Sequence, residues 1–263
     1  MIDIKGGEQL KLMDRANTIV RTILAELARM VDPGLTTEDL DRHADRRLKE
    51  EGARSAFKGY RLAGSPDYPA VLCVSLNEEV VHGIPSRKRV LRAGDLLSLD
   101  FGAVVDGYYG DAAVTVEVGR VSDEASHLNR TTRESLLKAV EATRAGNHIS
   151  DISAAVQTHV EGRGYSIVRD FVGHGIGRKL HEEPQVPNYV ATGGPDPRLE
   201  VGMVLAIEPM VAAGRADVEL DRRDGWTVRT KDRSLAAHWE LSVAVTGAGP
   251  WVLGGPVDGM VTT

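Results

Sequence analysis

The sequence predicts an α+β fold in which two similar halves face each other across a cleft. Three observations support this prediction. Amphipathic helices occur as two pairs along the chain, the two pairs match each other in sequence, and two strand-like segments flank an Asp-Gly turn. The strand-like segments lie where two such halves would need them.

The four predicted helices are recognised by their apolar spacing and their end signals. Apolar residues recur at helical spacing over residues 8–31, and Pro33-Gly34 ends the pattern. A second helix follows Thr36, whose side chain can cap it, and Gly52 is placed to end it. The same patterns predict two further helices over residues 122–144 and 150–164.

A shift of 112 residues superposes the second half of the chain on the first. It places Gly34 on Gly146 and Gly52 on Gly164, so both helix-ending signals coincide. Cap and core positions between them also match: Asp39 with Asp151, Leu40 with Ile152, Ala44 with Val156, and Leu48 with Val160. Helical patterns also agree by chance, so these matches leave an accidental similarity open as the alternative.

The strand prediction is most specific around Asp106-Gly107, a two-residue hairpin signal flanked by segments 96–105 and 108–118. In such a hairpin position i pairs with 213 − i. Asp100 and Asp111 then share the face away from the core, with backbones about 7–8 Å apart as diagonal neighbours. Segments 203–211 and 239–246 also resemble strands, and the Gly- and Pro-rich sequence from Gly247 resembles surface coil.

Composition excludes several classes of protein. The 263 residues carry 32 basic and 38 acidic side chains, a formal net charge of −6, and the single cysteine cannot form an internal disulfide. Basic residues are interspersed with acidic ones, which disfavours a broad nucleic-acid-binding face, and no apolar run is long enough for a membrane span. We expect a cytoplasmic monomer with one domain over residues 1–250, halves at about 5–120 and 121–247, and a tail at 251–263.

Two carboxylates on one sheet face need a cation, a shared proton or solvent. A solvated sheet face is the simplest interpretation of Asp100 and Asp111. Three further groups favour a metal: His174 among glycines, Glu208 after an apolar run, and Glu240 in a strand-like segment. Four carboxylates and one imidazole suit two divalent cations, and two such cations can serve a hydrolase.

The order of these motifs resembles that of the type I methionine aminopeptidases, the short bacterial form of peptidase family M24. The resemblance extends over about residues 3–247. It is carried by Asp100 and Asp111, Gly-His-Gly-Ile-Gly at 173–177, Ile-Glu-Pro-Met at 207–210 and Glu240, with further motifs at 81–85, 181–186 and 226–234. It implies the pita-bread fold, in which two pseudo-twofold-related halves surround a central antiparallel sheet.

The resemblance also implies a role for each metal ligand. Asp100 binds one metal, Asp111 and Glu240 bridge both, and His174 and Glu208 complete the second. The cofactor would be two divalent ions such as Mn, Fe or Co, with a bridging hydroxide that attacks the carbonyl of the first residue.

Three side chains would then act on the substrate. Glu208 would help to move a proton, His181 would contact the substrate carbonyl or its tetrahedral oxyanion, and His82 would lie near the peptide nitrogen. Taken alone, His82 is more typical of a turn and His181 of an exposed helix or loop. The five other histidines have no ligand context and are expected to be structural or exposed: His43, His127, His148, His159 and His238.

The methionine pocket is implied by Tyr60, Tyr68, Cys73 and Trp226, although Cys73 alone could be a small buried hydrophobe. Here the sequence departs from the family pattern. The two tyrosines are eight residues apart rather than three, which indicates a five-residue insertion within 61–67. Two further positions depart from the pattern, Phe57 and Leu180.

The resemblance implies removal of the initiator methionine from nascent polypeptides with a small second residue, at the ribosome, without direct nucleic-acid or membrane binding. Two alternatives remain: an X-Pro aminopeptidase of the same fold and a non-catalytic peptide-binding module of that fold. The former normally carries an additional N-terminal domain, for which the first helix, beginning near Glu8, leaves no room. A phosphate-binding loop around His174 is disfavoured because the Lys-Ser/Thr of such loops is missing.

Overall fold

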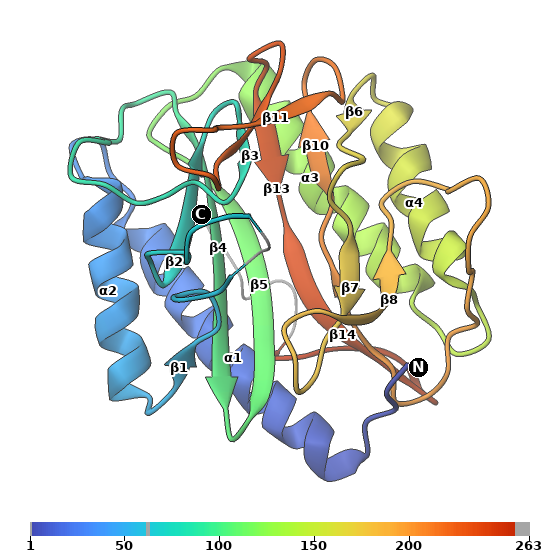
Figure 1. Ribbon diagram of the computed structural model, residues 1–263. Coiled ribbons are helices and arrows are strands. Elements are labelled where there is room, and N and C mark those ends of the chain that lie inside the picture. The colour runs from blue at the N-terminus through green and yellow to red at the C-terminus, as the bar shows by residue number, and fades with distance from the viewer. Residues whose placement is uncertain (1, 62–63, 256–263) are drawn as a thin grey trace.

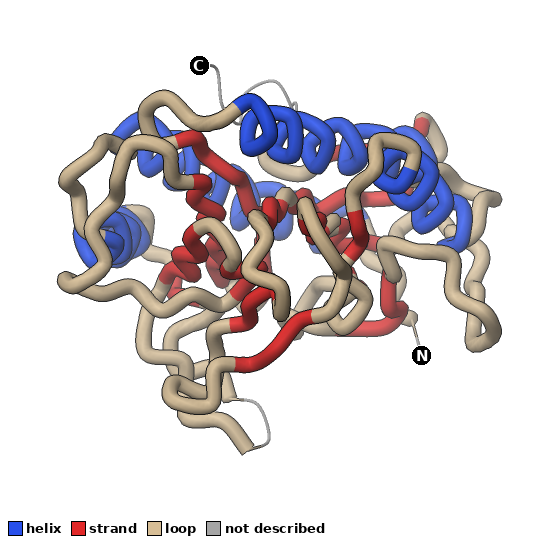
Figure 2. Tube along the Cα trace, turned by 90° about the horizontal axis from the view of Figure 1, so that it is seen from above, coloured by secondary structure: helices blue, strands red, loops and turns tan. Residues whose placement is uncertain are grey.

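The computed structural model describes residues 2–61 and 64–255. Helices and strands form separate layers, and in Figure 2 the helices lie on one side of the strands and loops on the other. The helices are α1 (Gly7–Met30), α2 (Thr37–Glu50), α3 (Asp123–Ala142) and α4 (Ile149–Glu161). None of the helices in this described part has the length and apolar character that crossing a bilayer requires.

The largest sheet combines strands from both halves of the chain (Figure 1), so the halves share one core. Its strand order is β1 (Arg54–Ser55), β4 (Leu96–Val105), β5 (Tyr108–Glu117), β14 (Glu240–Thr246), β9 (Val204–Ile207), β7 (Gly173–Gly175) and β8 (Glu182–Val186). Two strands join it off this path: β2 (Leu72–Leu76) pairs with β4, and β15 (Gly249–Val252) pairs with β14.

Two three-stranded sheets complete the fold. One has the order β13 (Ala236–His238), β10 (Met210–Ala212) and β6 (Ser166–Ile167). The other has the order β11 (Val218–Leu220), β12 (Val228–Thr230) and β3 (Glu79–Val81). These short strands were not predicted, except where they fall within a longer predicted segment.

The predicted hairpin is confirmed in position and register. β4 and β5 pair with Asp100 opposite Ala113 and Gly102 opposite Asp111, as the 213 − i rule requires. Asp106 and Gly107 have φ values of 48° and 82°, the left-handed conformations that a two-residue turn of this type needs at both central positions. The turn sequence therefore fixes which residues of the two longest strands share a face.

The two halves repeat one backbone arrangement, as the match at a spacing of 112 predicted. Gly34 and Gly146 have φ values of 99° and 97°. Each donates its backbone N–H to a leucine carbonyl further along the same half of the chain: Gly34 to Leu91 O and Gly146 to Leu199 O. The strand pairs repeat as well, because Arg54 lies opposite Val104 just as Ser166 lies opposite Ala212.

The two partner residues, Val104 and Ala212, are 108 residues apart rather than 112. The spacing of 108 relates the two strand regions that follow the helix pairs. Gly94 and Gly202 obey it and have φ values of 101° and 98°. The same spacing carries Asp100 onto Glu208. Two of the predicted metal ligands therefore occupy equivalent positions in the two halves.

The helix prediction is confirmed at both ends of α2 and at the start of α3. Thr36 caps α2 by accepting the N–H of Asp39, and Ser122 caps α3 by accepting the N–H of Ala125. Gly52 follows α2 with a φ of 66°, as expected for a glycine at a helix end.

Two strand predictions are wrong in detail. Segment 203–211 is not one strand but two, β9 and β10, which belong to different sheets. The break falls at Pro209, because proline has no N–H for a ladder and its ring fixes the backbone angle. Trp239 separates β13 from β14, so the second strand begins at Glu240.

The prediction of surface coil from Gly247 onward is also wrong where it can be examined. Residues 249–252 form β15, and the next residue, Leu253, is completely buried. Strand formation extends the sheet and covers Ser242, whose carbonyl accepts the N–H of Leu253. The end of the predicted tail, residues 256–263, lies outside the described residues.

Candidate active site

Strand register brings the five predicted metal ligands onto one face of the main sheet. One row across β2, β4, β5 and β14 contains Cys73, Asp100, Ala113 and Glu240. Glu208 follows β9 directly after Ile207, the partner of Leu241, and so continues this row next to Glu240. Because alternate residues of a strand share a face, the next row on this face lies two positions along.

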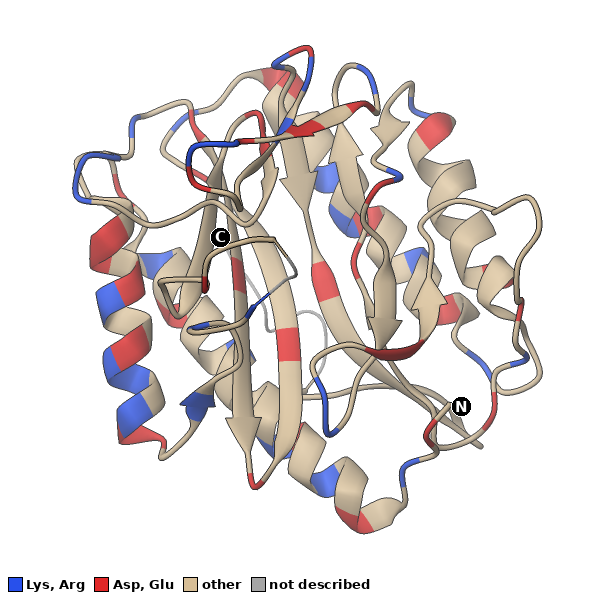
Figure 3. Cartoon of the chain, viewed as in Figure 1, with Lys and Arg blue, Asp and Glu red and all other residues tan. Residues whose placement is uncertain are grey.

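That neighbouring row contains Asp111 and His174. Asp111 lies opposite Gly102 on β4, and its carbonyl accepts a hydrogen bond from the Ser242 hydroxyl at 2.9 Å. Ser242 and His174 both lie opposite Ala206 of β9, on its two sides. In Figure 3 acidic positions appear as isolated bands on otherwise uncharged β4, β5 and β14.

The ligand atoms of Asp111, His174 and Glu240 lie within 4.8 Å of one another. All three residues are buried, with 4%, 7% and 2% of their surfaces exposed. One oxygen each of Asp111, Glu240 and Asp100 is buried without a hydrogen-bond partner among the described residues. The solvated sheet face is therefore wrong as an interpretation of the two aspartates.

The carboxylates of the cluster also raise one another's pKa values. Burial raises the pKa of Asp100 to about 7. Burial, followed by repulsion from Asp100, raises the pKa of both Asp111 and Glu208, and burial with repulsion from Asp111 raises the pKa of Glu240. Buried carboxylates with unpartnered oxygens match the oxygen-rich donor set that divalent cations prefer, so the residues fit a metal site.

His174 is oriented by its two ring nitrogens. Nδ1 lies 2.9 Å from the carbonyl oxygen of Gly175, which favours the tautomer with the proton on Nδ1. Nε2 lies 3.4 Å from Oε1 of Glu208 and belongs to the ligand cluster. Burial lowers the pKa of His174 to about 3, so the ring is neutral and Nε2 can donate a lone pair.

A cavity of about 920 Å³ opens over this cluster. All predicted site residues line it: Tyr60, Tyr68, Cys73, His82, Asp100, Asp111, His174, His181, Glu208, Trp226 and Glu240. Phe57 and Leu180, the two departures from the family pattern, line it as well. The structure thus brings together every residue that the sequence singled out for chemistry.

The predicted pocket residues form one end of the cavity. The rings of Tyr68 and Trp226 meet edge to face with centroids 5.2 Å apart. The indole N–H of Trp226 donates to Pro66 O at 2.8 Å, which ties the inserted segment to the pocket. Cys73 is buried, and burial raises the pKa of its thiol, so it presents a neutral sulfur to the cavity.

His82 is held in a conformation that few residues adopt, with a φ of 61°. Its ring lies 5.9 Å from that of Trp226 and 5.7 Å from that of Phe171, both edge to face. The following Gly83 cannot be replaced easily, since an added Cβ would lie 2.2 Å from Val74 O. Close backbone contact therefore explains the glycine that follows this histidine.

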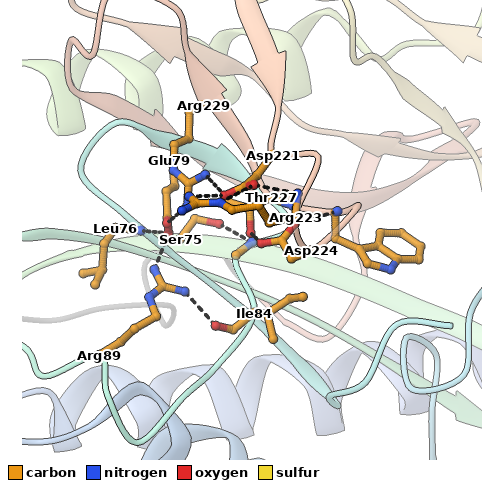
Figure 4. A network of polar contacts seen from close by, with 12 residues as sticks. Ser75, Leu76, Glu79, Ile84, Arg89, Asp221, Arg223, Asp224, Thr227 and Arg229 are labelled. Atoms are coloured by element: carbon orange, nitrogen blue, oxygen red, sulfur yellow. Dashed lines mark hydrogen bonds and ion pairs between the residues drawn. The ribbon is translucent and has the colours of Figure 1, made fainter. Parts of the chain in front are cut away.

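A partly buried ionic network centred on the buried Glu79 fixes the segment before His82 (Figure 4). Glu79 of β3 pairs with Arg229 of β12 at 2.9 Å and also with Arg89, while Arg229 contacts Asp221 at 2.6 Å. The loop between β11 and β12 holds Trp226, whose backbone N–H donates to Asp224 at 2.8 Å. The network therefore joins the two segments that carry His82 and Trp226.

One residue near the cluster was missed. His238 was expected to be structural or exposed, but it is 1% exposed and its Nε2 lies 3.7 Å from Oε2 of Glu208. His238 ends β13 and lies two positions before Glu240, the first residue of β14, so its position depends on a strand break that the sequence analysis did not predict. The other four histidines have structural or surface contacts: His43 with Glu26, His127 with Tyr165, His159 with Glu134, and His148 as the residue preceding α4.

Comparison with known proteins places this geometry in a family. The model of metallopeptidase family M24 matches residues 11–247. The chain is 49% identical to the methionine aminopeptidase of Clostridium acetobutylicum over 253 residues, covering 96% of this chain and 98% of the relative. It is 45% identical to methionine aminopeptidase 1 of Bacillus subtilis over 251 residues, covering 95% and 97%.

Solved structures agree. The methionine aminopeptidase of Thermotoga maritima superposes with a TM-score of 0.92 at 42% identity, covering 97% of this chain and 100% of that one, which confirms the predicted pita-bread fold. An Xaa-Pro dipeptidase of Bacillus anthracis gives a TM-score of 0.73 at 22% identity and is covered over only 62% of its length. That second likeness concerns the fold alone.

Proposed function

This chain belongs to metallopeptidase family M24, and we propose that it is a methionyl aminopeptidase that removes the N-terminal methionine from nascent polypeptides. The observation that carries the proposal is the buried cluster of Asp111, His174 and Glu240, with Asp100 and Glu208 lining the same cavity, in a chain almost half identical to a methionine aminopeptidase. The same family membership supports a divalent metal cofactor.

We propose two divalent cations per chain, such as Mn, Fe or Co. Asp111 and Glu240 would bridge them, Asp100 would bind one, and His174 and Glu208 the other. This assignment is supported by the unpartnered oxygens of Asp100, Asp111 and Glu240. When bound, such cations polarise a carbonyl group and lower the pKa of a water molecule.

The remaining roles belong to side chains around the cluster. His181 would donate a hydrogen bond to the carbonyl oxygen of the first residue, and His82 would lie at the peptide nitrogen. Burial lowers the pKa of His82 to about 4, so this ring is neutral near pH 7 and can accept a hydrogen bond from the peptide N–H. Oε2 of Glu208 would hold the proton that passes to the leaving amine.

The methionine side chain would enter between Tyr68, Cys73 and Trp226. Neutral sulfur and aromatic edges suit a thioether, which packs well against both. Pocket contacts of this kind discriminate by about 1–3 kcal/mol per methylene. Phe57 and Leu180 therefore change the shape of the pocket without removing its apolar character.

We further propose that the enzyme acts as a monomer in the cytoplasm, on polypeptide N-termini emerging from the ribosome and with a small second residue. All proposed ligands and pocket residues come from one chain, so no second copy is needed to complete the site.

The test is release of free methionine from Met-Ala-Ser by the metal-reconstituted protein, compared with Leu-Ala-Ser and Ala-Ala-Ser. We expect release of methionine and much slower cleavage of the other two peptides. Turnover of Ala-Pro-Pro but not Met-Ala-Ser would identify an X-Pro aminopeptidase instead. Tight peptide binding without turnover of any of these peptides would identify a binding module.

A further inference from the structure

Tyr60 and His181 meet at the cavity although 121 residues separate them in the chain. The Tyr60 hydroxyl lies 2.7 Å from Nδ1 of His181, and the two rings meet edge to face with centroids 5.5 Å apart. Both residues line the cavity. With Nδ1 engaged by Tyr60, Nε2 is the ring nitrogen left for a ligand.

Residues on either side of the segment 61–67 hold Tyr60 in this place. Backbone hydrogen bonds close its neck, from Gly59 N to Tyr68 O at 2.8 Å and from Tyr68 N to Tyr60 O at 2.9 Å. Just beyond the neck, the Arg61 guanidinium contacts both oxygens of Asp67, at 2.6 and 3.0 Å. The two chain segments on either side, residues 59–61 and 67–68, are thus joined next to Tyr60, whose hydroxyl contacts His181.

The direction of the Tyr60–His181 hydrogen bond follows from the chemistry of the two groups. A phenol O–H is a better donor than an imidazole N–H, and an imidazole nitrogen is a better acceptor than a phenol oxygen. Both groups are uncharged near pH 8, which lies above the ordinary pKa of an imidazole and below that of a phenol. The favoured arrangement therefore has the proton on the tyrosine oxygen and a lone pair on Nδ1.

We propose that Tyr60, held by the backbone hydrogen bonds that join residues 59 and 60 to Tyr68, is a positioning residue that fixes His181 in the tautomer with its proton on Nε2. A neutral imidazole carries one ring proton, so acceptance at Nδ1 places that proton on Nε2. An Nε2–H group stabilises negative charge that develops on a carbonyl oxygen, whereas a lone pair there repels it. This step deepens the proposed function and rests on it, since the carbonyl oxygen belongs to the proposed substrate.

The tautomer can be measured without turnover. In ¹⁵N-histidine-labelled protein, long-range ¹H–¹⁵N correlations report which ring nitrogen carries the proton, and His181→Gln identifies the His181 signals. The spectra are recorded for the metal-free and the Zn²⁺-loaded protein. We expect a protonated Nε2 in the unmodified protein and a mixture of tautomers in Tyr60→Phe, which keeps the ring and loses the hydroxyl.

Tyr109→Phe is the matched control. Tyr109 packs with the same apolar cluster as Tyr60, and its hydroxyl makes no hydrogen bond within residues 2–61 and 64–255. This variant retains the His181 tautomer of the unmodified protein if the proposal holds. A protonated Nδ1 in the unmodified protein, or identical His181 spectra in Tyr60→Phe, would overturn the proposal.

The rate of methionine release tests whether the His181 tautomer matters for the reaction. For Met-Ala-Ser we expect Tyr60→Phe to lower kcat about threefold to tenfold, the effect of one hydrogen bond, and to leave KM nearly unchanged. A changed tautomer with an unchanged kcat would refute the role in the reaction. If the unmodified protein releases no methionine, the proposed function fails, and the spectra still decide whether Tyr60 controls the tautomer.

Discussion

Asp111 on β5 and Glu240 on β14 bring carboxylate oxygens within 4.8 Å of each other, and each carries a buried oxygen without a hydrogen-bond partner in the described structure. Two buried carboxylates at this separation repel each other when both are ionised. In the metal-free protein at least one proton is therefore retained, and a divalent cation would replace it. This relationship is the basis of the predicted dependence on metal.

Replacing Glu240 by Gln removes one of the two charges proposed to bridge the metals and leaves the size of the side chain almost unchanged. We expect Glu240→Gln to bind fewer cations than the unmodified protein and to lose at least about 100-fold in kcat, since an electrostatic contact to the reacting centre is lost. Elemental analysis and methionine release measure the two effects. Glu200→Gln, at an exposed position, serves as the control. Full metal content and turnover in Glu240→Gln would remove Glu240 from the ligand set.

The metal-free protein is expected to become less stable as the pH rises from about 7 to 8.5. Burial raises the pKa of Asp100 to about 7 and also raises the pKa of Asp111. The folded protein then binds more protons than the unfolded chain in this range, so stability falls with rising pH. His82 and His174, whose pKa values in the folded protein are about 4 and about 3, oppose this change only where the histidines of the unfolded chain are still protonated, which ends as the pH rises above about 7.

Thermal unfolding of the metal-free and reconstituted protein at the two pH values tests this expectation. Each kcal/mol lost lowers the midpoint by about 2–4 °C in a domain of this size. Bound cations keep the carboxylates ionised, so the reconstituted protein loses less stability. A metal-free midpoint that stays constant or rises with pH would contradict the account.

Glu79→Gln is expected to destabilise the protein by about 3 kcal/mol, because it breaks a largely buried ion pair and leaves cations without a full partner. Glu79 contacts both Arg89 and Arg229 and is 7% exposed. Because this network precedes His82, KM for Met-Ala-Ser is expected to rise as well. Urea unfolding measures the stability change.

The matched control for Glu79 lies on β11 of the same three-stranded sheet, where Glu219 pairs with Arg233 and both side chains are about half exposed. Glu219→Gln is expected to cost less than about 1 kcal/mol, as usual for surface pairs. Equal effects of Glu79→Gln and Glu219→Gln would show that the network contributes no more than surface contacts.

Gly175→Ala is expected to destabilise the protein by about 1–3 kcal/mol and to weaken metal binding. An added Cβ would lie 2.2 Å from Glu183 O, so the strand that carries His174 must shift. Gly247 has nothing within 4 Å of its Cβ position, which makes Gly247→Ala the control. Metal titration and denaturant unfolding follow the two effects. Unaltered metal affinity in Gly175→Ala would show that metal binding does not depend on the backbone position of β7.

Local signals in the sequence predicted the parts of the site that depend on neighbouring residues. Asp106-Gly107 sets the register of β4 and β5, and that register alone places Asp100 and Asp111 on one face. The pairing of β14 with β5 and β9 joins segments that are far apart in the chain. No local spacing determines such pairs: the sequence singled out Glu240 as a candidate ligand, and only the resemblance to a family assigned it a place beside the two aspartates.

The predictions that failed, for His238 and for β15, also failed because contacts between distant segments decide the structure there. His238 was missed because its face depends on strand boundaries around Trp239, and β15 was missed because its Gly-Pro start is typical of coil. Pairing with β14 outweighs that local preference, and burial of Leu253 stabilises the result.

The most direct test of the account is the rate of methionine release from Met-Ala-Ser as Mn²⁺, Fe²⁺ or Co²⁺ is added stepwise to chelated, folded protein. We predict no release before addition and a rate that rises to a plateau as the carboxylate cluster fills. Methionine release at full rate from the chelated protein, or no release at any concentration of the three metals, would contradict the central claim.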